Sequence, residues 1–406
     1  KEDMAASDKV RIQYASKYDM SSNYWKNTIG MIRGIDRLKV KSRKESAENA
    51  FQLWAIRNSS SEDEYNLALG MIFQAVEQNK PLLGPLQYLE EAMLNAVEII
   101  TPAYTAYEIL GQKMKEAEAR EELKEFYAGF YKDYNEPTDR KVAKKMIRMV
   151  RWNVKDLPEV LSSVIDTEFG GDIDAYVDYL YDNSVFVSEQ RALSATPEQI
   201  EYDPAFILAS SVIGKMNEWN RKSMDNRVEK MFGQYLYIRG LMERQPERAW
   251  YPDANFTIRL TYGRVLPYRL ETGGVSDWYT TLDGVMAKED TTSTEFIVPR
   301  RLKELYEAKD YGRYANEKGE LPVAFLSDCD ITGGNSGSPM MNGRGELIGL
   351  AFDGNWESMS CNVAFEPEVQ RAIGVDVRYV LFVIDKFAGA DWLLDEMTIV
   401  KDGVRI

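Results

Sequence analysis

The sequence predicts an α+β protein of more than one domain, with a helical domain over residues 1–245 followed by a mostly β domain over residues 246–406. Two observations support this prediction. The length of 406 residues exceeds what one hydrophobic core ordinarily supports. The spacing of apolar residues also changes near Pro246, from the three- and four-residue steps of helices to the alternation of strands.

Helical patterns follow one another through the first domain. Apolar residues recur at helical spacing over residues 65–76, after the capping-box pattern Ser61-x-x-Glu64. Pro81 and Pro85 are expected to break this run, because proline lacks the amide hydrogen that a helix needs. Further helices are predicted at 121–134, 139–153, 173–182 and 204–242. We expect the many Tyr, Trp and Met side chains of these helices to form the interior of the domain.

Beyond Pro246 the sequence favours strands. Residues 256–265 alternate apolar and polar side chains, as a half-buried strand does. The pair Asn342-Gly343 predicts a hairpin turn, because both residues tolerate positive φ. Other strands are predicted at 296–298, 322–326, 338–341 and 346–352, and helices at 299–309 and 377–387, the last closing the domain.

Composition excludes several classes of partner. The formal net charge is −15 and the isoelectric point is near 4.8, which disfavours binding to nucleic acid or to an anionic membrane surface. No stretch has the apolar length of a membrane-spanning helix, and the N-terminus lacks the apolar region of a signal peptide, so membrane insertion is not expected. The chain contains no histidine and only two cysteines, and no metal or nucleotide cofactor is predicted.

The segment Thr332–Pro339 has the form of a serine-peptidase nucleophile loop. Its glycines allow a turn that presents the Ser336 hydroxyl, and the N–H groups of Gly334 and Ser336 can converge as an oxyanion hole. A serine nucleophile needs a neighbouring base, ordinarily an imidazole, and this chain has none. An ordinary glycine-rich loop is the alternative interpretation.

The hairpin after Ser336 supports the catalytic interpretation. In double-barrel serine peptidases a strand about twenty residues after the nucleophile lines the first specificity pocket. Phe352 lies at that spacing and is a candidate wall residue. Asp330 stands where trypsin-like enzymes place a carboxylate for Lys or Arg side chains, so a basic preference is an alternative.

Cys329 and Cys361 flank this hairpin unit. A disulfide between them would close a loop of about 33 residues and would stabilise the fold by roughly 3 to 4 kcal/mol. It would tie the two walls of the pocket together. Two unpaired, buried thiols are the alternative.

Several phrases of the sequence resemble the bacterial dipeptidyl-peptidase 7 and 11 family of serine exopeptidases, and the likeness is greatest to dipeptidyl-peptidase 7. The phrases are Tyr251–Thr257, Leu260–Gly263, Asp330–Pro339, Gly345–Trp356 and Val375–Val380, and Asn23–Asn27 extends the likeness into the helical part. The resemblance implies a chymotrypsin-like double β-barrel interrupted by a helical domain. This chain would supply the helical cap domain and the barrel half that carries the nucleophile, with a C-terminal helix.

The resemblance also implies roles for individual residues. Ser336 would be the nucleophile, and Gly334 would help to stabilise the oxyanion. Asp353 would hold the α-ammonium group of a peptide with a free N-terminus, with Asn23 or Asn27 as a further hydrogen-bonding partner. For Asp353, a turn-capping role before Gly354 is the alternative.

Specificity, location and assembly follow from the same resemblance. Where relatives that cleave after acidic residues supply an arginine, this chain has Gly354, which would leave an open pocket for a hydrophobic P1 side chain. Periplasmic or cell-surface location and a homodimer are further expectations. The histidine and aspartate of the triad would lie in an upstream part that this sequence lacks, so the chain alone is predicted to be inactive.

Two other functions remain open from the sequence. One is a non-catalytic peptide-binding module that keeps the cleft without the triad. The other is a serine hydrolase that uses lysine as its base. Labelling of Ser336 by a fluorophosphonate would separate an activated serine from a binding module.

Overall fold

The computed structural model describes residues 1–59, 64–111, 116–252, 257–270, 272–293, 295–401 and 403–405. The chain separates into two compact units, and each is made of two stretches of sequence. The helical unit comprises residues 1–22 and 46–251, and the sheet unit comprises residues 23–45 and 252–406. The sequence-based boundary at residue 245 assigned residues 23–45 to the helical domain, whereas their contacts place them in the sheet unit.

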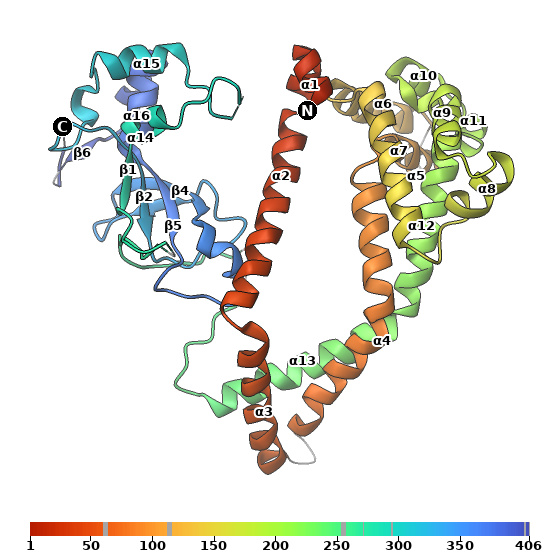
Figure 1. Ribbon diagram of the computed structural model, residues 1–406, viewed down its shortest axis with the longest axis horizontal. Coiled ribbons are helices and arrows are strands. Elements are labelled where there is room, and N and C mark those ends of the chain that lie inside the picture. The colour runs from red at the N-terminus through yellow and green to blue at the C-terminus, as the bar shows by residue number, and fades with distance from the viewer. Residues whose placement is uncertain are drawn as a thin grey trace. The chain divides into compact units, whose positions relative to one another are not determined.

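The helical unit is a succession of helices (Figure 1). They are α1 (Glu2–Ala6), the first part of α2 (Asp8–Arg37), most of α3 (Val40–Asn58), α4 (Ala68–Leu89), α5 (Ile100–Gly111), α6 (Glu116–Lys132), α7 (Glu136–Asn153), α8 (Ile165–Glu168), α9 (Ile173–Asn183), α10 (Glu189–Ser194), α11 (Pro197–Glu201), α12 (Pro204–Lys222) and α13 (Met224–Arg244). The helices predicted at 121–134, 139–153 and 173–182 are confirmed as α6, α7 and α9.

Two helix predictions were wrong in detail. Pro81 and Pro85 do not break the helix but lie inside α4, because Leu89 beyond them is fully buried in the core and holds the last turns in place. The helix predicted over 204–242 is interrupted at Ser223, which ends α12 and precedes α13. Ser61 of the predicted capping box lies outside the described residues.

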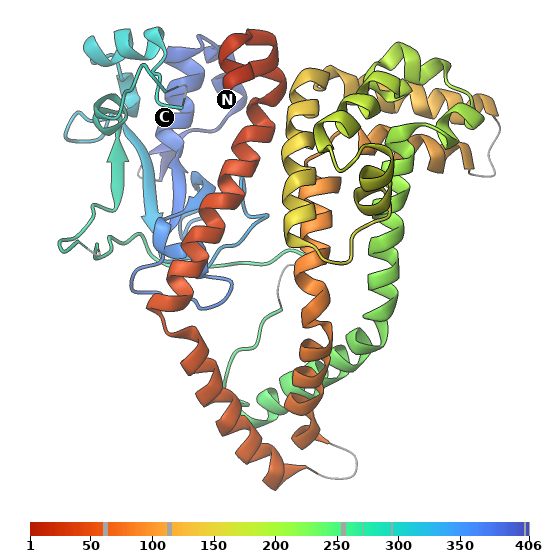
Figure 2. The ribbon, with the colours of Figure 1, turned by 45° about the vertical axis from the view of Figure 1, so that its right-hand side comes forward.

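Close packing joins α13 to the first part of α4 (Figure 2). A Cβ added to Gly233 of α13 would stand 2.9 Å from the carbonyl oxygen of Ala68 and 3.0 Å from Met71 and Ile72 of α4. Glycine is therefore required here by the nearness of the neighbouring backbone.

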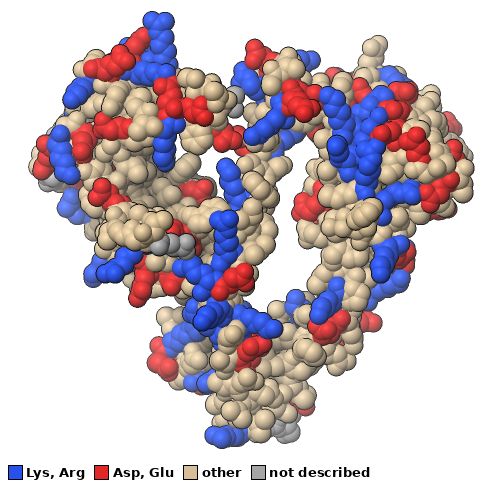
Figure 3. All heavy atoms as spheres, viewed as in Figure 1, with Lys and Arg blue, Asp and Glu red and all other residues tan. Residues whose placement is uncertain are grey.

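Ion pairs connect α7 to α9 on the outside of the helical unit. Charges of both signs are interleaved over this unit in Figure 3. The pairs are Arg140 with Asp182 at 2.8 Å, Lys144 with Asp178 at 2.7 Å and Arg148 with Asp174 at 2.5 Å. The acidic partners follow one another at four-residue steps, so they share one face of α9.

A buried carboxylate organises the interior beneath these ion pairs. Asp139 accepts hydrogen bonds from the amides of Glu98 (2.8 Å) and Ile99 (3.0 Å) and from the Tyr181 hydroxyl (2.7 Å). Burial raises the pKa of Asp139 to about 7, although the three donors favour the charged form. This aspartate fixes the start of α5 against α7 and α9.

The sheet unit contains a five-stranded antiparallel sheet in the order β1-β2-β5-β4-β3 (Figure 1). The strands are β1 (Tyr279–Thr281), β2 (Pro322–Ser327), β3 (Pro339–Met341), β4 (Leu347–Gly354) and β5 (Ala372–Asp376). Helices α14 (Leu282–Ala287), α15 (Arg300–Glu307) and α16 (Val377–Phe382) accompany it, and β6 (Val400–Lys401) pairs with β7 (Val404–Arg405). The strands of the described residues form an open sheet, so the predicted barrel half is not seen as a closed barrel.

Most local predictions for this unit are confirmed. The strands at 322–326, 338–341 and 346–352 correspond to β2, β3 and β4, and the helix at 299–309 to α15. The helix at 377–387 is α16 continued by a π-helical turn. It does not close the chain, because a 3-10 helix at Asp391–Glu396 and the β6–β7 hairpin follow it.

Two strand predictions were wrong. Within the described part of 256–265, only Val265 makes a β-bridge, to Ser327, and the apolar side chains of Ile258 and Leu260 stay exposed. Alternation alone did not produce a strand there, since pairing with β2 is limited to the end of the segment. Residues 296–298 form a loop whose Val298 is buried in the core.

The hairpin turn between β3 and β4 lies where it was predicted, but its chemistry differs. Positive φ occurs at Gly345 (77°) and not at Asn342 or Gly343. The Asn342 side chain accepts hydrogen bonds from the amides of Arg344 (2.9 Å) and Glu346 (3.2 Å). The asparagine therefore organises the turn through its side chain, as an Asx turn does.

In the described residues, no helix combines the length and apolar character that crossing a membrane requires.

Candidate functional site

The serine loop, residues 332–338, connects β2 to β3 and lies along β4. Gly334 and Gly337 have φ values of 101° and 81°, which only glycine adopts without strain. The Gly337 amide donates to the Ala351 carbonyl at 2.7 Å, and the Ala351 amide donates to the Ser338 carbonyl at 2.9 Å. The end of the loop is thus held to β4 by main-chain hydrogen bonds.

Ser336 is exposed at the turn of this loop. Its hydroxyl donates a long hydrogen bond of 3.4 Å to the carbonyl of Phe352, and no side-chain base accepts it in the part of the chain that the structure describes. The hydroxyl is therefore accessible but not activated by these residues.

Three main-chain amides of the serine loop are left open. Those of Asn335, Gly337 and Ser338 donate to protein carbonyls, whereas those of Gly333, Gly334 and Ser336 donate to no acceptor among the described residues. All three residues are exposed, so these N–H groups are available to a ligand. An oxyanion hole requires at least two such donors, and the predicted pair, Gly334 and Ser336, is among them.

A β-bulge in β4 sets the surface beside Ser336. Ala351 pairs with Gly374 and Asp353 pairs with Ile373, so Phe352 has no partner in the register. Because of this extra residue, Phe352 and Asp353 are both exposed although they are consecutive. The bulge was not predicted, since the sequence carries no local signal for it.

Asp353 keeps most of its hydrogen-bonding capacity. One carboxylate oxygen accepts from the amide of Gly354 at 2.7 Å, which is the turn-capping contact considered from the sequence. The side chain is exposed, so the carboxylate can bind a further cation without losing this bond.

Gly354 has a packing reason to be glycine. A Cβ at this position would stand 2.8 Å from the Cβ and 3.1 Å from the hydroxyl of Ser358. It would therefore point toward Ser358 and not into open space, and the open pocket that was expected beside Gly354 stays a prediction.

Asn23 and Asn27 lie on the part of α2 that belongs to the sheet unit. Both are exposed, and the Asn27 amide nitrogen lies 3.5 Å from the Met359 sulfur. Gly30 and Gly34 bring this helix against residues 359 and 360, because a Cβ at Gly34 would stand 2.4 Å from Ser360. Both asparagines are thus carried by a helix that packs on the loop following β4.

The predicted disulfide is not formed in this structure, where Cys329 and Cys361 are free and partly buried thiols. The Cys361 sulfur instead faces the Ile331 carbonyl at 3.6 Å. Burial, followed by the nearby charge of Asp330, raises the pKa of the Cys361 thiol. Asp330 therefore lies close to this thiol, at the base of the serine loop.

Sequence reasoning missed a buried polar network between β4 and β5. Asn355, Gln370 and Arg371 are all nearly inaccessible to solvent and hydrogen-bond across the β4–β5 loop, residues 355–371. Their burial depends on long-range contacts, so no local pattern could have revealed it.

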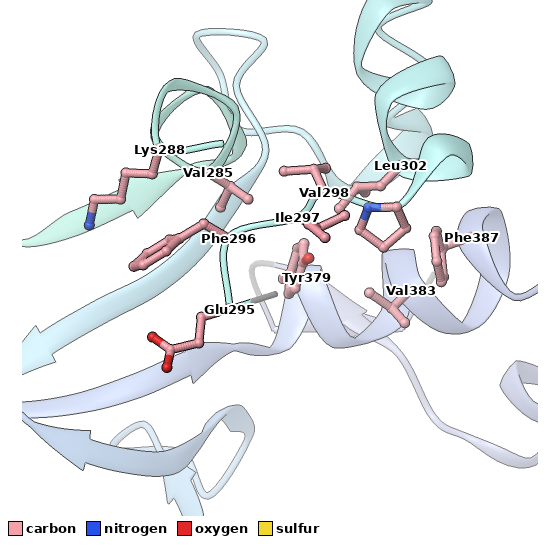
Figure 4. Close-up of a pocket in the computed structure, with 11 residues that line it drawn as sticks. Val285, Lys288, Glu295, Phe296, Ile297, Val298, Leu302, Tyr379, Val383 and Phe387 are labelled. Atoms are coloured by element: carbon pink, nitrogen blue, oxygen red, sulfur yellow. The ribbon is translucent and has the colours of Figure 1, made fainter. Parts of the chain in front are cut away.

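The sheet unit also contains an apolar cavity of about 410 Å³ (Figure 4). Its lining includes Val285, Ile297, Leu302, Tyr379, Val383 and Phe387. None of the lining residues comes from the serine loop or from β4. Within the described residues, no group of side chains has the composition of a metal site.

A model of the peptidase S46 family matches residues 1–399 of this chain. Dipeptidyl-peptidase 7 of Phocaeicola vulgatus is 44% identical over 412 residues, covering 99% of this chain and 57% of that protein. The Asp/Glu-specific dipeptidyl-peptidase of Porphyromonas gingivalis is 37% identical, covering 98% and 56%. The crystal structure of Porphyromonas endodontalis DPP11 in complex with the dipeptide Arg-Glu matches with a TM-score of 0.86 and 32% identity, covering 97% of this chain and 58% of that one. The chain thus spans little more than half the length of these relatives.

Proposed function

This chain belongs to the peptidase S46 family, and on that premise we propose that it supplies the nucleophile and the substrate-amine site of a serine dipeptidyl peptidase. The observation that carries the proposal is the serine loop, in which an exposed Ser336 stands beside the open amides of Gly334 and Ser336. Hydroxyl and donors on one loop suit acyl transfer.

The proposed reaction is peptide-bond cleavage through an acyl-enzyme. The Ser336 oxygen attacks the carbonyl carbon after the second residue while a base takes its proton, and the amides of Gly334 and Ser336 stabilise the oxyanion. The protonated base then gives the proton to the departing amine, and water releases the dipeptide by the same steps. Since this chain has no histidine, the base and its orienting carboxylate are proposed to come from outside these 406 residues.

Asp353 is proposed to bind the α-ammonium group of the substrate. Asp353 is exposed and follows Phe352 in β4. The Phe352 carbonyl accepts the hydrogen bond of the Ser336 hydroxyl, so the proposed cation site lies one residue from the contact of the nucleophile with β4. Asn23 or Asn27 would add a hydrogen bond. Fixing the ammonium at one distance from Ser336 would select release of two residues.

A hydrophobic P1 residue is the proposed preference. Phe352 is 62% exposed and offers an aromatic wall beside Ser336, and Gly354 adds no cation to the site. Relatives of this chain include both dipeptidyl-peptidase 7 and Asp/Glu-specific enzymes. Basic preference through Asp330 is the alternative, and faster release after Lys or Arg than after Leu, Phe or Met would favour it.

Other expectations from the sequence remain proposals here. The open sheet would form part of a chymotrypsin-like double barrel, and residues 1–245 would include the helical cap. The complete enzyme would act in the periplasm or at the cell surface and would form a homodimer. A non-catalytic peptide-binding role is a second candidate for the chain alone, because no described residue activates Ser336.

Fluorophosphonate labelling tests the catalytic proposal. We expect no labelling of the 406-residue chain, and labelling at Ser336 with dipeptide release in the peptidase that includes this chain and its base. Ser336→Ala should lower the rate of release by at least about 10³-fold. Substantial activity of S336A, or labelling elsewhere, would contradict the assignment of the nucleophile.

A further inference from the structure

Arg371 immediately precedes β5, and only 5% of its surface is exposed to solvent. Every hydrogen bond of its guanidinium in the described part of the chain goes to a main-chain carbonyl. The acceptors are Pro267 (2.9 and 3.2 Å), Pro367 (2.6 Å), Glu368 (3.2 Å) and Gln370 (2.7 Å). One side chain thus ties the β4–β5 loop to the segment that contains Pro267.

The backbone of Arg371 is joined to the other end of the same loop. Its amide donates to the Asn355 side-chain oxygen at 2.9 Å, and the Asn355 amide donates to the Arg371 carbonyl at 3.0 Å. The Ser358 hydroxyl donates to the same carbonyl at 3.1 Å. These bonds fix the loop two residues after Asp353.

The loop also forms the support for α2. Gly30 and Gly34 pack directly on Met359 and Ser360, and Arg37 pairs with Glu366 at 3.0 Å. Within the loop, the Gln370 side chain donates to the Ala364 carbonyl at 3.1 Å and accepts from the Glu366 amide at 2.9 Å. Asp353 lies just before this loop, and the α2 asparagines lie on a helix that packs against it. The β4–β5 loop therefore supports both.

We propose that Arg371 is a positioning residue that fixes Asp353 relative to Asn23 and Asn27 for recognition of the substrate's α-ammonium group. This inference rests on the proposed function. A cation site built from separate segments binds well only when its ligands are held at fixed separations. Arg371 touches no substrate and acts through the loop.

Arg371→Lys tests the inference in the peptidase that includes this chain and its base. A lysine presents its donors from a single nitrogen and cannot reach carbonyls on opposite sides of a guanidinium. For a peptide with a free amine, we expect KM to rise about tenfold while kcat stays within about twofold. The preference for the free over the N-acetylated peptide should fall by about the same factor, because the acetylated peptide has no ammonium to position.

Arg344→Lys is the matched control, since Arg344 pairs with Glu346 at the exposed β3–β4 turn. It should leave both constants unchanged. If R371K does not fold, Ser358→Ala removes the hydroxyl that bonds the Arg371 backbone and the Asn355 side chain, and it should produce a smaller change in the same direction. An equal loss of kcat for both peptides, or an unchanged amine preference in a folded variant, would overturn the positioning role.

The same panel separates the inference from the proposed function. A wild-type enzyme that shows no preference for a free amine would contradict the amine site itself. A wild-type preference that survives in R371K would contradict only the role of Arg371.

Discussion

The two loops that adjoin β4 treat their polar groups in opposite ways. In the serine loop, the amides of Gly334 and Ser336 are exposed and have no acceptor in the part of the chain that the structure describes. In the β4–β5 loop, Asn355 and Arg371 are buried and hydrogen-bonded throughout. The difference indicates a division of labour, because donors left open can bind a ligand whereas donors that are satisfied hold the site in place.

The largest loss of stability is expected from a substitution in the β4–β5 loop, whose buried polar groups are hydrogen-bonded. Asn355→Ala removes side-chain hydrogen bonds to Val369, Glu357, Ser358 and Arg371 from a buried position. We expect the unfolding free energy of the sheet unit to fall by about 3 kcal/mol. Calorimetry of the 406-residue chain measures this.

Asn362→Ala serves as the control for that variant. Asn362 is exposed in the same loop, and its side-chain oxygen accepts from the Thr332 hydroxyl at 2.9 Å and from the Cys361 thiol at 3.6 Å. A change of under about 1 kcal/mol is expected. Equal destabilisation by the two variants would show that burial does not separate the two asparagines.

A smaller loss is expected from the backbone of the serine loop. Gly337→Ala places a Cβ in open space, but at a φ of 81° that alanine adopts only with strain. We expect a loss of about 1 to 2 kcal/mol. Gly343→Ala, also in open space but without positive φ, should cost little, and thermal unfolding of both variants compares them.

The contact between the two loops should affect the rate at which the Cys361 thiol is alkylated. Since burial and the charge of Asp330 raise the pKa of Cys361, less thiolate is present at a given pH and alkylation is slowed. Asp330→Asn removes this charge, which should lower the pKa of Cys361 and increase the rate of its alkylation at pH 8. Peptide mass mapping after timed iodoacetamide treatment measures it, and a slower rate in D330N would contradict the electrostatic contribution.

The smallest effect on stability is expected at the nucleophile. Ser336→Ala removes only an exposed hydroxyl with one bond of 3.4 Å. Its unfolding free energy should stay within about 0.5 kcal/mol of the wild type. Loss of more than about 1 kcal/mol in denaturant titration would mean that the open loop is held by its serine.

Local features of the fold could be predicted and long-range ones could not. The hairpin of β3 and β4 follows from turn residues and alternation, and the glycines of the serine loop follow from the turn that they permit. The continuation of α4 through Pro81 and Pro85 depends on packing beyond the prolines, which propensity does not contain.

The candidate site was predicted in its parts but not in its support. Ser336 and Gly334 were selected from a short motif, whereas Asp353 was assigned from the family resemblance, and their roles stay predictions. Arg371 could not be selected, because an arginine before a strand is ordinarily a surface residue. The assignment of Asn23 to the sheet unit likewise depends on Gly30 and Gly34 meeting residues more than three hundred positions away, as from Gly30 to Met359.

The bulge at Phe352 changes which face of the sheet the following side chains of β4 point to. Gly349 and Ala351 point to the buried side of the sheet, and strict alternation would send Asp353 there as well. Because Phe352 is unpaired, the alternation restarts after it, and the Asp353 carboxylate lies on the exposed face. A strand of the same composition that lost the bulge would bury that charge, whereas deleting Phe352 would remove the aromatic wall and leave Asp353 facing outward.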